Sequence, residues 1–366
     1  MNEVDFYLID LKSRFDKIKP NTYYLSYSGG KDSHFLYWFI KEYLKRDDIP
    51  IVGINTYMEH HEIRDRILKN SDVVLKPSLK PLEIKEKYGS PCFSKEQDFY
   101  IYYYQNALRK GKKPSKTIQQ KIDGTYDKGF SGISKKAREY VKSGNAHNIT
   151  HLCCYYLKKK PAHDYEKETG LKPILGIRGS ESMLRKQQYK SCFTNNGKFT
   201  PIHDLSDELL DKIYEQYNIE IPEVYNHICR TGCMGCPYGS FKHDTEKELA
   251  LINDNQFNFV KDYFKESYQA LGINPDDCRR RWFVVSQEAS KINIKKYIEN
   301  FVKIRDKNSN IVPLILNKPQ QKLYDVIRSQ KEAHKPVRII ILKARQWPNG
   351  VLNSYRRTNP VSDSHT

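Results

Sequence analysis

A pair of glycines between a strand-like and a helix-like segment points to phosphate chemistry. The stretch from Ser28 to Ser33 is Ser-Gly-Gly-Lys-Asp-Ser. Glycines allow a sharp turn that brings backbone N–H groups to a phosphate, and the following helix presents its positive end to the anion. Lys31 adds a charge, and Asp32 either organises the loop or assists a Mg²⁺ ion. The longer Gly-x-x-x-x-Gly-Lys-Ser/Thr pattern is absent here, so γ-phosphate hydrolysis is not the first expectation.

The chain has eight cysteines, which are a second set of residues that could bind a metal or react. Cys153 and Cys154 are adjacent, and Cys233 and Cys236 form a Cys-x-x-Cys pair. Two thiolate pairs can close a tetrahedral site, which suits either Zn²⁺ or an iron–sulfur cluster. Because the sequence starts with acidic residues instead of a secretory signal, we do not expect a disulfide framework.

The ligand set among these cysteines stays open. Cys229, Cys233 and Cys236 have a three-ligand spacing of their own, in which case the adjacent pair or Cys192 supplies the fourth ligand. Cys92 and Cys192 also fit the role of small, buried apolar side chains.

Together these motifs resemble a known family. The stretch Tyr27–Ser33 resembles the PP-loop of the ATP pyrophosphatases, a superfamily with sulfonucleotide reductases, tRNA thiolation enzymes and DNA phosphorothioation proteins. Further stretches resemble segments of the phosphoadenosine phosphosulfate reductase family, and these are Cys153–Lys158, Gly176–Arg178 followed by Ser182 and Arg185, and Pro201–Asp207. The paired cysteines resemble the four-cysteine pattern of the iron–sulfur reductases.

The resemblance implies a fold, a cofactor and a substrate class. The fold implied is α/β, a doubly wound parallel sheet of the adenine nucleotide alpha-hydrolase (PP-loop) type. The implied ligands are a [4Fe-4S] cluster, with Zn²⁺ as the alternative, and ATP or phosphoadenylyl sulfate, with a thiol reductant as partner. The cluster ligands would be Cys153, Cys154, Cys233 and Cys236.

The expected anion-binding residues follow from the loop and from the chemistry of arginine. The guanidinium group presents a fork that matches tetrahedral oxyanions, so Lys158, Arg178 and Arg185 are expected to hold a phosphate or sulfate. Lys31 and Asp32 are the expected catalytic residues of the loop. The expected nucleotide-binding residues are Ser26, Ser28, Gly29, Gly30, Lys31, Asp32, Ser33, Gly176, Arg178 and Arg185.

Two departures from the family separate nucleotide binding from sulfonucleotide reduction. The chain lacks the Glu-Cys-Gly-x-His motif that carries the reductase nucleophile. Cys278 is the remaining candidate nucleophile, because basic neighbours favour a thiolate, although an incidental cysteine fits as well. Asn55-Thr56-Tyr57 replaces the Asp-Thr-Gly of the reductases. Adenylation and sulfur transfer on tRNA or DNA is therefore an alternative, as is a non-catalytic nucleotide-sensing regulator or DNA-binding phage protein.

The elements that must position these residues alternate between strand and helix. Strands are predicted at 21–27, 50–54, 71–75 and 172–177, and helices at 35–44 and 204–217, where Ser206 is the expected N-cap. Alternation of this kind predicts a parallel sheet covered on both faces, with ligands bound beyond the carboxyl ends of its strands.

The charge of the chain favours polyanionic partners. The 366 residues include 62 Lys and Arg against 44 Asp and Glu, a net charge of +18. Residues 105–145 hold 11 basic and 3 acidic side chains, which fits either a solvated insertion or an arm that contacts nucleic acid. No run approaches the roughly 20 apolar residues of a membrane span, and a cytoplasmic location without membrane partners is expected.

The sequence suggests three regions. Residues 1–290 are expected to form the PP-loop domain, with a cysteine-rich region at 226–242. Residues 291–346 resemble the opening of a phage terminase large subunit, but run into Trp347-Pro348-Asn349-Gly350 instead of a complete Walker A loop. Within this region a helix is expected near 320–330 and a strand at 337–342, and an ordinary basic helix and strand appendage is the alternative. Residues 347–366 are expected to be a disordered tail.

Overall fold

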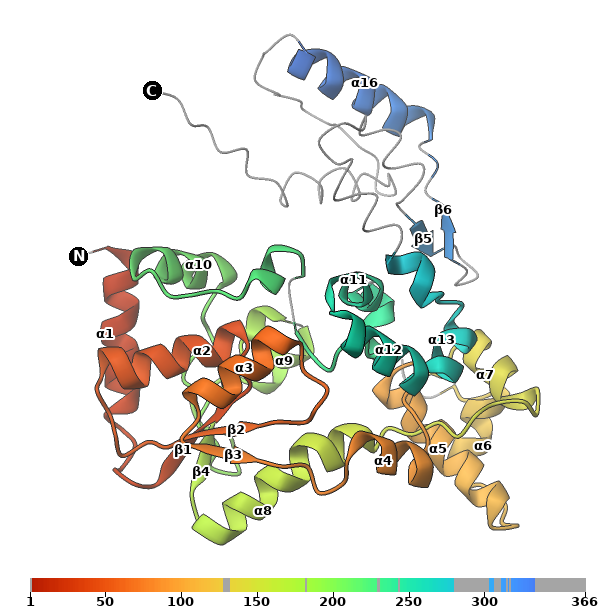
Figure 1. Ribbon diagram of the computed structural model, residues 1–366, viewed down its shortest axis with the longest axis horizontal. Helices are drawn as coiled ribbons and strands as arrows, with labels where there is room; N and C mark the ends of the chain where they lie inside the picture. Colours follow the sequence, from red (N-terminus) through yellow and green to blue (C-terminus); the bar gives the residue numbers. More distant parts are fainter. Residues whose placement is uncertain are drawn as a thin grey trace. The chain divides into compact units, whose positions relative to one another are not determined.

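The computed structural model describes residues 2–127, 132–181, 183–228, 231–242, 244–279, 303–305, 311–313, 315 and 317–332 (Figure 1). The chain divides into two compact units, Met1–Phe283 and Val284–Thr366. The domain boundary that we expected at residue 290 stays a prediction. No described helix is long and apolar enough to cross a membrane.

A four-stranded parallel sheet forms the centre of the first unit. Its strands are β1 (Tyr23–Tyr27), β2 (Ile51–Ile54), β3 (Val73–Leu75) and β4 (Lys172–Ile174). Their order is β3-β2-β1-β4, and Leu25 of β1 is in register with Ile51 of β2 and Ile174 of β4. The predicted α/β class with a parallel sheet is confirmed.

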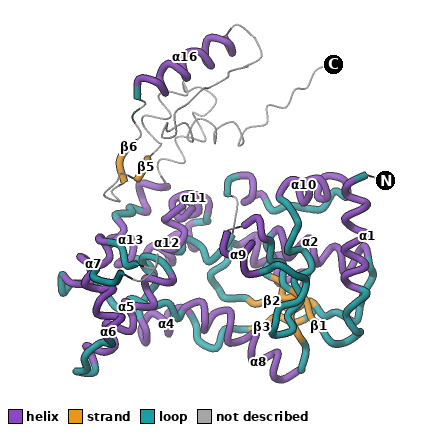
Figure 2. The backbone as a smooth tube through the Cα atoms, turned by 180° about the vertical axis from the view of Figure 1, so that it is seen from behind, coloured by secondary structure: helices purple, strands orange, loops and turns teal. Residues whose placement is uncertain are grey.

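Helices cover both faces of this sheet (Figures 1 and 2). Leu25 and Tyr27 of β1 are buried in a core that also includes residues of α2 (Lys31–Trp38) and α3 (His61–Asn70). Tyr24 points to the other face, where its ring lies 5.2 Å from that of Tyr165 on α8 (Lys160–Thr169). Successive residues of a strand face opposite sides, so β1 is covered twice, as the doubly wound class requires.

The strand order creates a switch point between β1 and β4. The chain passes from β1 outward to β3, and then returns to the other side of β1 to form β4. At such a point the connections leave in opposite directions, which opens a crevice beyond the carboxyl ends of the two strands. The glycine loop follows β1 and the segment with Arg178 follows β4, so both reach this crevice.

Two more helices pack beside the sheet. The helix α1 (Glu3–Phe15) starts with a capping box between Asn2 and Asp5 and lies against α10 (Asp207–Gln216). The helix α10 begins after Ser206, whose hydroxyl accepts a hydrogen bond of 3.1 Å from the N–H of Leu209. The predicted N-cap is confirmed, whereas the helix starts three residues later than the predicted 204.

A second core lies beside the sheet within the same unit. The long connection from β3 to β4 contributes α4 (Pro81–Tyr88), α5 (Lys95–Arg109), α6 (Lys116–Asp123) and α7 (Lys135–Lys142). The chain after α10 adds α11 (Asp244–Leu251), α12 (Asp254–Tyr263) and α13 (Lys265–Leu271). Both segments bury apolar side chains in one cluster. The described part of residues 105–145 is thus largely helical and contributes Ile122, Ile133, Ala137 and Val141 to this core.

Short elements complete the unit. The helix α9 (Met183–Gln188) follows a 3₁₀ turn, Gly179–Glu181. Wider π-helical turns extend α2 and precede α8, and further 3₁₀ turns flank the cysteine-rich region; these turns are Phe39–Tyr43, Tyr155–Lys159, Glu223–Asn226 and Pro237–Lys242.

The second unit contains a small antiparallel pair and a helix. The strands are β5 (Lys303–Arg305) and β6 (Ile311–Pro313), and the helix is α16 (Lys318–Glu332). Asn317 and Gln320 exchange two hydrogen bonds of 3.0 Å between backbone N–H and side-chain oxygen at the start of α16. The helix expected near residues 320–330 is present. The expected strand at 337–342 and the tail from 347 lie outside the described residues.

Candidate nucleotide and thiol sites

The turn of the glycine loop requires a glycine at position 29. Gly29 has φ +71°, in the left-handed region that favours glycine. A Cβ atom at this position would lie 2.9 Å from the carbonyl oxygen of Ile63 on α3. Gly29 is therefore required both by its backbone conformation and by the close approach of α3.

Hydrogen bonds hold the rest of the loop in place. The hydroxyl of Ser33 accepts from the N–H of Ser28 at 3.2 Å and donates to the carbonyl of Gly30 at 3.0 Å. The N–H of Lys31, the first residue of α2, donates to the hydroxyl of Tyr225 at 3.1 Å. The hydroxyl of Tyr225 thus occupies a backbone donor that a phosphate oxygen would use.

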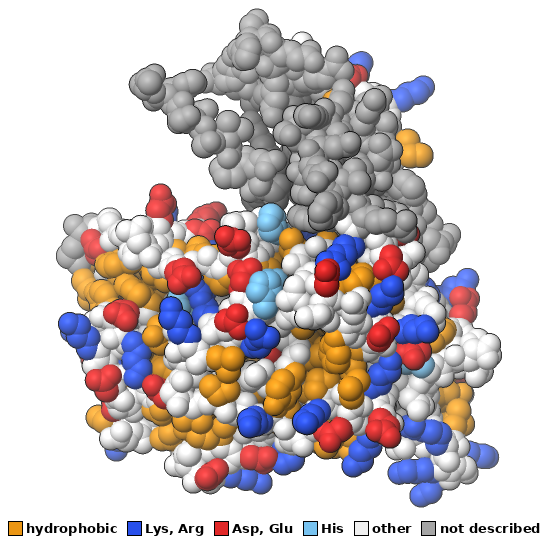
Figure 3. All heavy atoms as spheres, in the orientation of Figure 1, with side chains coloured by type: hydrophobic (Ala, Val, Ile, Leu, Met, Phe, Trp, Pro, Cys, Tyr) orange, Lys and Arg blue, Asp and Glu red, His pale blue; other side chains and the backbone are white. Residues whose placement is uncertain are grey.

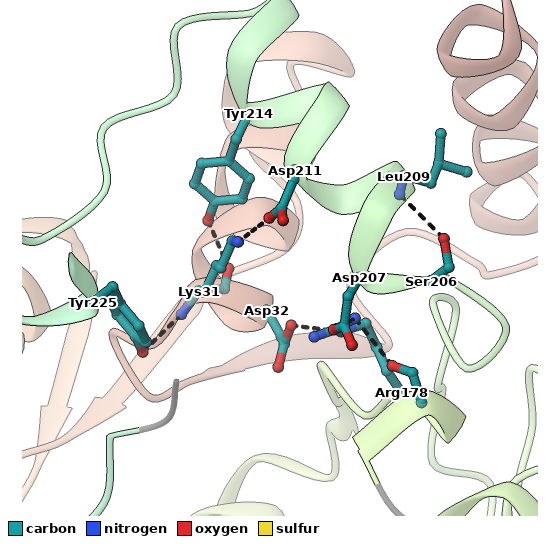
Figure 4. Close-up of polar contacts among 10 residues, drawn as sticks. Lys31, Asp32, Arg178, Ser206, Asp207, Leu209, Asp211, Tyr214 and Tyr225 are labelled. Atoms are coloured by element: carbon teal, nitrogen blue, oxygen red, sulfur yellow. Dashed lines mark hydrogen bonds and ion pairs between the residues drawn. The ribbon is translucent and has the colours of Figure 1, made fainter. Parts of the chain in front are cut away.

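Acidic side chains from α10 face the cations of this site (Figure 4). The ammonium of Lys31 pairs with Asp211 and lies 5.5 Å from the ring centre of Tyr214. Arg178 donates from Nε to Asp32 and from Nη1 to Asp207, both at 2.6 Å. Lys31 and Asp32 of the loop and Arg178 of the segment after β4, which belong to different sequence motifs, lie together at the switch point.

The end of β4 packs closely on the start of α2. A Cβ atom on Gly176 would lie 3.1 Å from the backbone of Asp32 and Ser33. Arg185 is half-buried on α9, and Ser26 is half-buried in β1. Ser182 lies outside the described residues. Because Gly176 has no side chain, the segment after β4 can approach the start of α2 closely.

The paired cysteines lie together in the second core. The thiol of Cys153 lies 4.0 Å from that of Cys154, to which it donates a hydrogen bond. This hydrogen bond, with burial and the charges of Cys154, Cys236 and Cys233, raises the pKa of Cys153. The same hydrogen bond and the nearby Lys95 and Lys158 lower the pKa of Cys154 to about 6, against the effect of burial. The four predicted ligands thus share one electrostatic neighbourhood.

A lysine and a glutamate accompany these thiols. Lys158 lies 3.8 Å from a carboxylate oxygen of Glu59, which is buried. The charges of Cys233 and Glu59 raise the pKa of Lys158. Burial raises the pKa of Cys233 to about 11, although Lys158 opposes this. Lys158, predicted to bind a substrate anion, is held beside Glu59 and the cysteines.

The turn that carries Cys233 and Cys236 is fixed by its neighbours. Gly235 has φ +59°, its N–H donates to Glu248 at 3.0 Å, and its carbonyl accepts from the hydroxyl of Tyr268 at 2.6 Å. The N–H of Met234 donates to the carbonyl of Met58 at 2.6 Å. That bond ties the cysteine turn to the loop that follows β2.

The remaining cysteines lie in different surroundings. Cys192 packs with the sheet-side core, where burial raises its pKa and Arg14 and Asp204 are its charged neighbours. Cys92 is buried against α13, and Cys278 packs at the edge of the second core. Cys229 lies outside the described residues. The alternative ligand Cys192 is therefore in a different core from the paired cysteines.

Several residues of the site were not singled out from the sequence. Tyr225 and Asp211 contact Lys31 of the loop across 194 and 180 positions of sequence, which local patterns do not reveal, and Asp207 contacts Arg178, 29 positions before it. The adjacent histidines His60 and His61 were also missed. Two neighbouring histidines in the connection between a strand of the parallel sheet and the next helix are the signal that was available.

Comparison with known proteins gives no family for this chain. No family model matches, and no curated protein matches either. Among similar solved structures is the NH3-dependent NAD synthetase from Campylobacter jejuni subsp. jejuni NCTC 11168 in complex with the nitrate ion. It is 13% identical, and the match covers 73% of this chain and 94% of that one with a TM-score of 0.30. The function proposed below rests on the residues of this chain.

Proposed function

We propose that this chain is an enzyme that binds an adenine nucleotide at Ser28–Ser33 for sulfur chemistry of the phosphoadenosine phosphosulfate reductase type. The observation that carries the proposal is the contact between Asp32 of the loop and Arg178 at the switch point of the sheet. Ligands of open α/β sheets bind in this crevice. Backbone N–H groups, the Lys31 ammonium and the Arg178 fork are the donors that a phosphate or sulfate requires.

Calorimetric titration with ATP and with phosphoadenylyl sulfate tests nucleotide binding. Lys31→Ala is expected to weaken binding, and Lys167→Ala, an exposed lysine on the opposite face of the sheet, is the matched control. Equal binding by both variants would contradict the loop assignment.

Product analysis then separates the possible reactions. Release of sulfite from phosphoadenylyl sulfate with a thiol donor supports the reductase. Release of pyrophosphate from ATP supports adenylation and sulfur transfer. Binding without either product favours the nucleotide-sensing regulator.

The proposed cofactor is a [4Fe-4S] cluster held by the two cysteine pairs, and two observations support it. The buried hydroxyl of Tyr263 has no hydrogen-bond partner among the described atoms, although Cys153, Cys233 and Cys236 surround it closely enough to raise its pKa together with burial. A sulfur acceptor at this position would satisfy the hydroxyl. Within the described residues, no three of these thiols come within 4.8 Å of one another.

The sulfur atoms of Cys153 and Cys154 lie 4.0 Å apart. Zinc–sulfur bonds of about 2.3 Å in a tetrahedron place the sulfur atoms about 3.8 Å apart. A cluster spans a larger volume and, when bound, supplies a redox-active group whose potential depends on its hydrogen bonds. The separation of this pair therefore also fits Zn²⁺, which stays the alternative to the proposed cluster.

Anaerobic purification followed by a visible spectrum and by iron, sulfide and zinc analysis tests the cofactor. The expected result is a broad chromophore with iron and sulfide, lost in Cys233→Ser and retained in Cys192→Ser. Zinc without iron would assign the alternative metal. A protein without iron or chromophore would reject the cluster.

A specific observation favours sulfur transfer on nucleic acid as the second candidate. Phe99 and Tyr103 of α5 are about two-fifths exposed, and the ring of His151 lies 4.9 and 6.0 Å from them. Lys95, at the start of α5, is close enough to Cys154 to lower its pKa. Figure 3 shows several Lys and Arg side chains at the end of this unit that is formed by α5 to α7. Aromatic rings beside basic groups are typical of surfaces that stack unpaired bases.

Binding of single-stranded RNA and DNA at several salt concentrations tests this surface. Tyr103→Ala is expected to weaken binding by about 1–3 kcal/mol, whereas Phe6→Ala, an exposed ring on α1, leaves it unchanged. Affinity that falls as salt rises would support phosphate contacts. No binding, or equal loss in both variants, would favour the reductase.

A further inference from the structure

A histidine pair and a glutamate follow β2 and are not used in the proposed function. His60 precedes α3, and His61 and Glu62 open its first turn. One potential ligand atom of each residue lies within 4.8 Å of those of the other two. The two imidazole rings are 4.2 Å apart at their centres, and Nδ1 of His60 lies 3.8 Å from Oε1 of Glu62.

Three of the four imidazole nitrogens of this group are buried without a hydrogen-bond partner among the described atoms. His60 is 6% exposed, and neither of its ring nitrogens has a partner at hydrogen-bond geometry among the described atoms, although the backbone of Leu251 lies near enough to affect the pKa of the imidazole. The buried Nδ1 of His61 also has none. Most buried polar side-chain atoms in proteins are hydrogen-bonded, because desolvation without compensation is unfavourable. Unpartnered nitrogens on both neighbouring rings indicate a ligand, to which each neutral imidazole offers one lone pair, because its other nitrogen carries the proton.

A small cavity adjoins His60. Its volume is about 10 Å³, and its lining includes Thr231, Met234 and Glu248. This space is about enough for one water molecule. The lining of this cavity is mainly apolar, and Glu248 is a further carboxylate beside it.

We propose that His60, His61 and Glu62 form a binding site for a divalent transition-metal ion of the zinc class. Two imidazoles and one carboxylate with an open position match the ligand sets of zinc and its first-row neighbours. Magnesium and calcium prefer sets made of oxygen atoms alone, and therefore fit this group poorly. The site is distinct from the paired cysteines, and its ligands contain no sulfur.

Anaerobic titration of the full chain with Co²⁺, followed by visible absorption, tests the site. Co²⁺ reports on its ligands because thiolate ligands add a sulfur-to-cobalt charge-transfer band that nitrogen and oxygen ligands lack. The wild type is expected to bind Co²⁺ with ligand-field bands and without the sulfur band for this site. His61→Ala and Glu62→Gln are each expected to weaken that binding by at least about tenfold.

Two variants keep the test interpretable. Glu62→Gln retains an oxygen for the N–H of Val224, which now donates to Glu62 at 3.3 Å, so it tests the site even if His61→Ala fails to fold. His163→Ala, an exposed histidine of α8, is the control and should bind as the wild type does. Unchanged affinity in Glu62→Gln, or Co²⁺ bands of thiolate type only, would overturn the proposal. Nucleotide binding is measured separately, so the two proposals can fail independently.

Discussion

The Nε of Arg178 donates a hydrogen bond of 2.6 Å to Oδ1 of Asp32 and thereby joins the segment after β4 to the first turn of α2. The same guanidinium contacts Asp207 of α10 at 2.6 Å. Arg178 is 6% exposed, so its charge depends on these carboxylates and not on water. The contact fixes the glycine loop relative to the segment after β4.

Asp32→Asn is therefore expected to destabilise the fold more than Asp207→Asn. The side chain of Asp32 is 24% exposed and that of Asp207 is 71% exposed, so solvent already screens the second pair. We expect the free energy of unfolding to fall by about 1–3 kcal/mol for Asp32→Asn and by less than about 1 kcal/mol for Asp207→Asn. Urea denaturation measures both, and equal losses would contradict the asymmetry.

Tyr225→Phe is expected to strengthen nucleotide binding. The hydroxyl of Tyr225 accepts the hydrogen bond of the Lys31 N–H, so a phosphate oxygen must replace it. Removing the hydroxyl leaves this donor to solvent and lowers the cost of binding by about 1 kcal/mol, roughly fivefold in affinity. Calorimetric titration with ATP checks this, with Tyr165→Phe, on α8 at the other face of the sheet, as the control. Weaker binding by Tyr225→Phe would mean that the hydroxyl contacts the nucleotide.

Gly29→Ala is expected to be more damaging than Gly111→Ala. Both glycines have positive φ, +71° and +64°. At Gly29 the added Cβ meets the Ile63 carbonyl, whereas at Gly111 nothing lies within 4 Å. The backbone conformation alone costs about 1–2 kcal/mol, and the steric conflict adds to this at Gly29 only. Thermal unfolding compares the two variants, and similar losses would show that α3 yields.

The sheet and its loop follow from local sequence. Strands were predicted within two or three residues of β1 to β4, because apolar, β-branched and aromatic runs end at turn residues such as Gly29. Since parallel strands share one carboxyl edge, the meeting of the loop with Arg178 also follows from the predicted topology. The cap at Ser206 follows from the same local rules.

Contacts made across long sequence distances were beyond such patterns. Asp211 and Tyr225 contact Lys31 of the glycine loop only because α10 and the following chain fold back over the loop. The described helices between residues 105 and 145 were read as a solvated or nucleic-acid-binding insertion, since high charge hides the few apolar residues, such as Ile122 and Val141, that anchor them. Only the folded structure shows that buried ring nitrogens of the histidine pair lack hydrogen-bond partners.

His34 is expected to make the fold sensitive to acid. Burial, with the charges of Arg66 and Lys69, lowers the pKa of His34 to about 3. Its Nδ1 lies 2.9 Å from the hydroxyl of Tyr27, and its ring stacks on Tyr37. The unfolded chain binds a proton near pH 6.5 that the folded chain rejects. Stability is therefore complete above that pH and falls as pH drops toward 3, by up to about 1.4 kcal/mol per unit.

Replacing His34 tests that slope. His34→Gln keeps a hydrogen-bonding group for Tyr27 but does not titrate, so the loss of stability between about pH 6 and pH 4 should become shallower. His147, whose pKa burial lowers to about 4, keeps part of the slope in the variant. Urea denaturation across this range gives the comparison, with the exposed His163→Gln as control. A parallel pH profile for His34→Gln and the wild type would exclude His34 as the source.

Tyr263→Phe is expected to leave unchanged or raise the stability of the cluster-free protein, and to lower the reduction potential of the cluster-loaded protein. The hydroxyl of Tyr263 is buried without a partner, so its removal from the metal-free protein should leave stability unchanged or raise it by up to about 1–3 kcal/mol. Tyr268→Phe is the contrast, because its hydroxyl donates to the carbonyl of Gly235 at 2.6 Å, and its loss should destabilise. In cluster-loaded protein, loss of a hydrogen bond to sulfur should lower the reduction potential. Denaturation and redox titration measure the two effects, and an unchanged potential would remove Tyr263 from the cluster's surroundings.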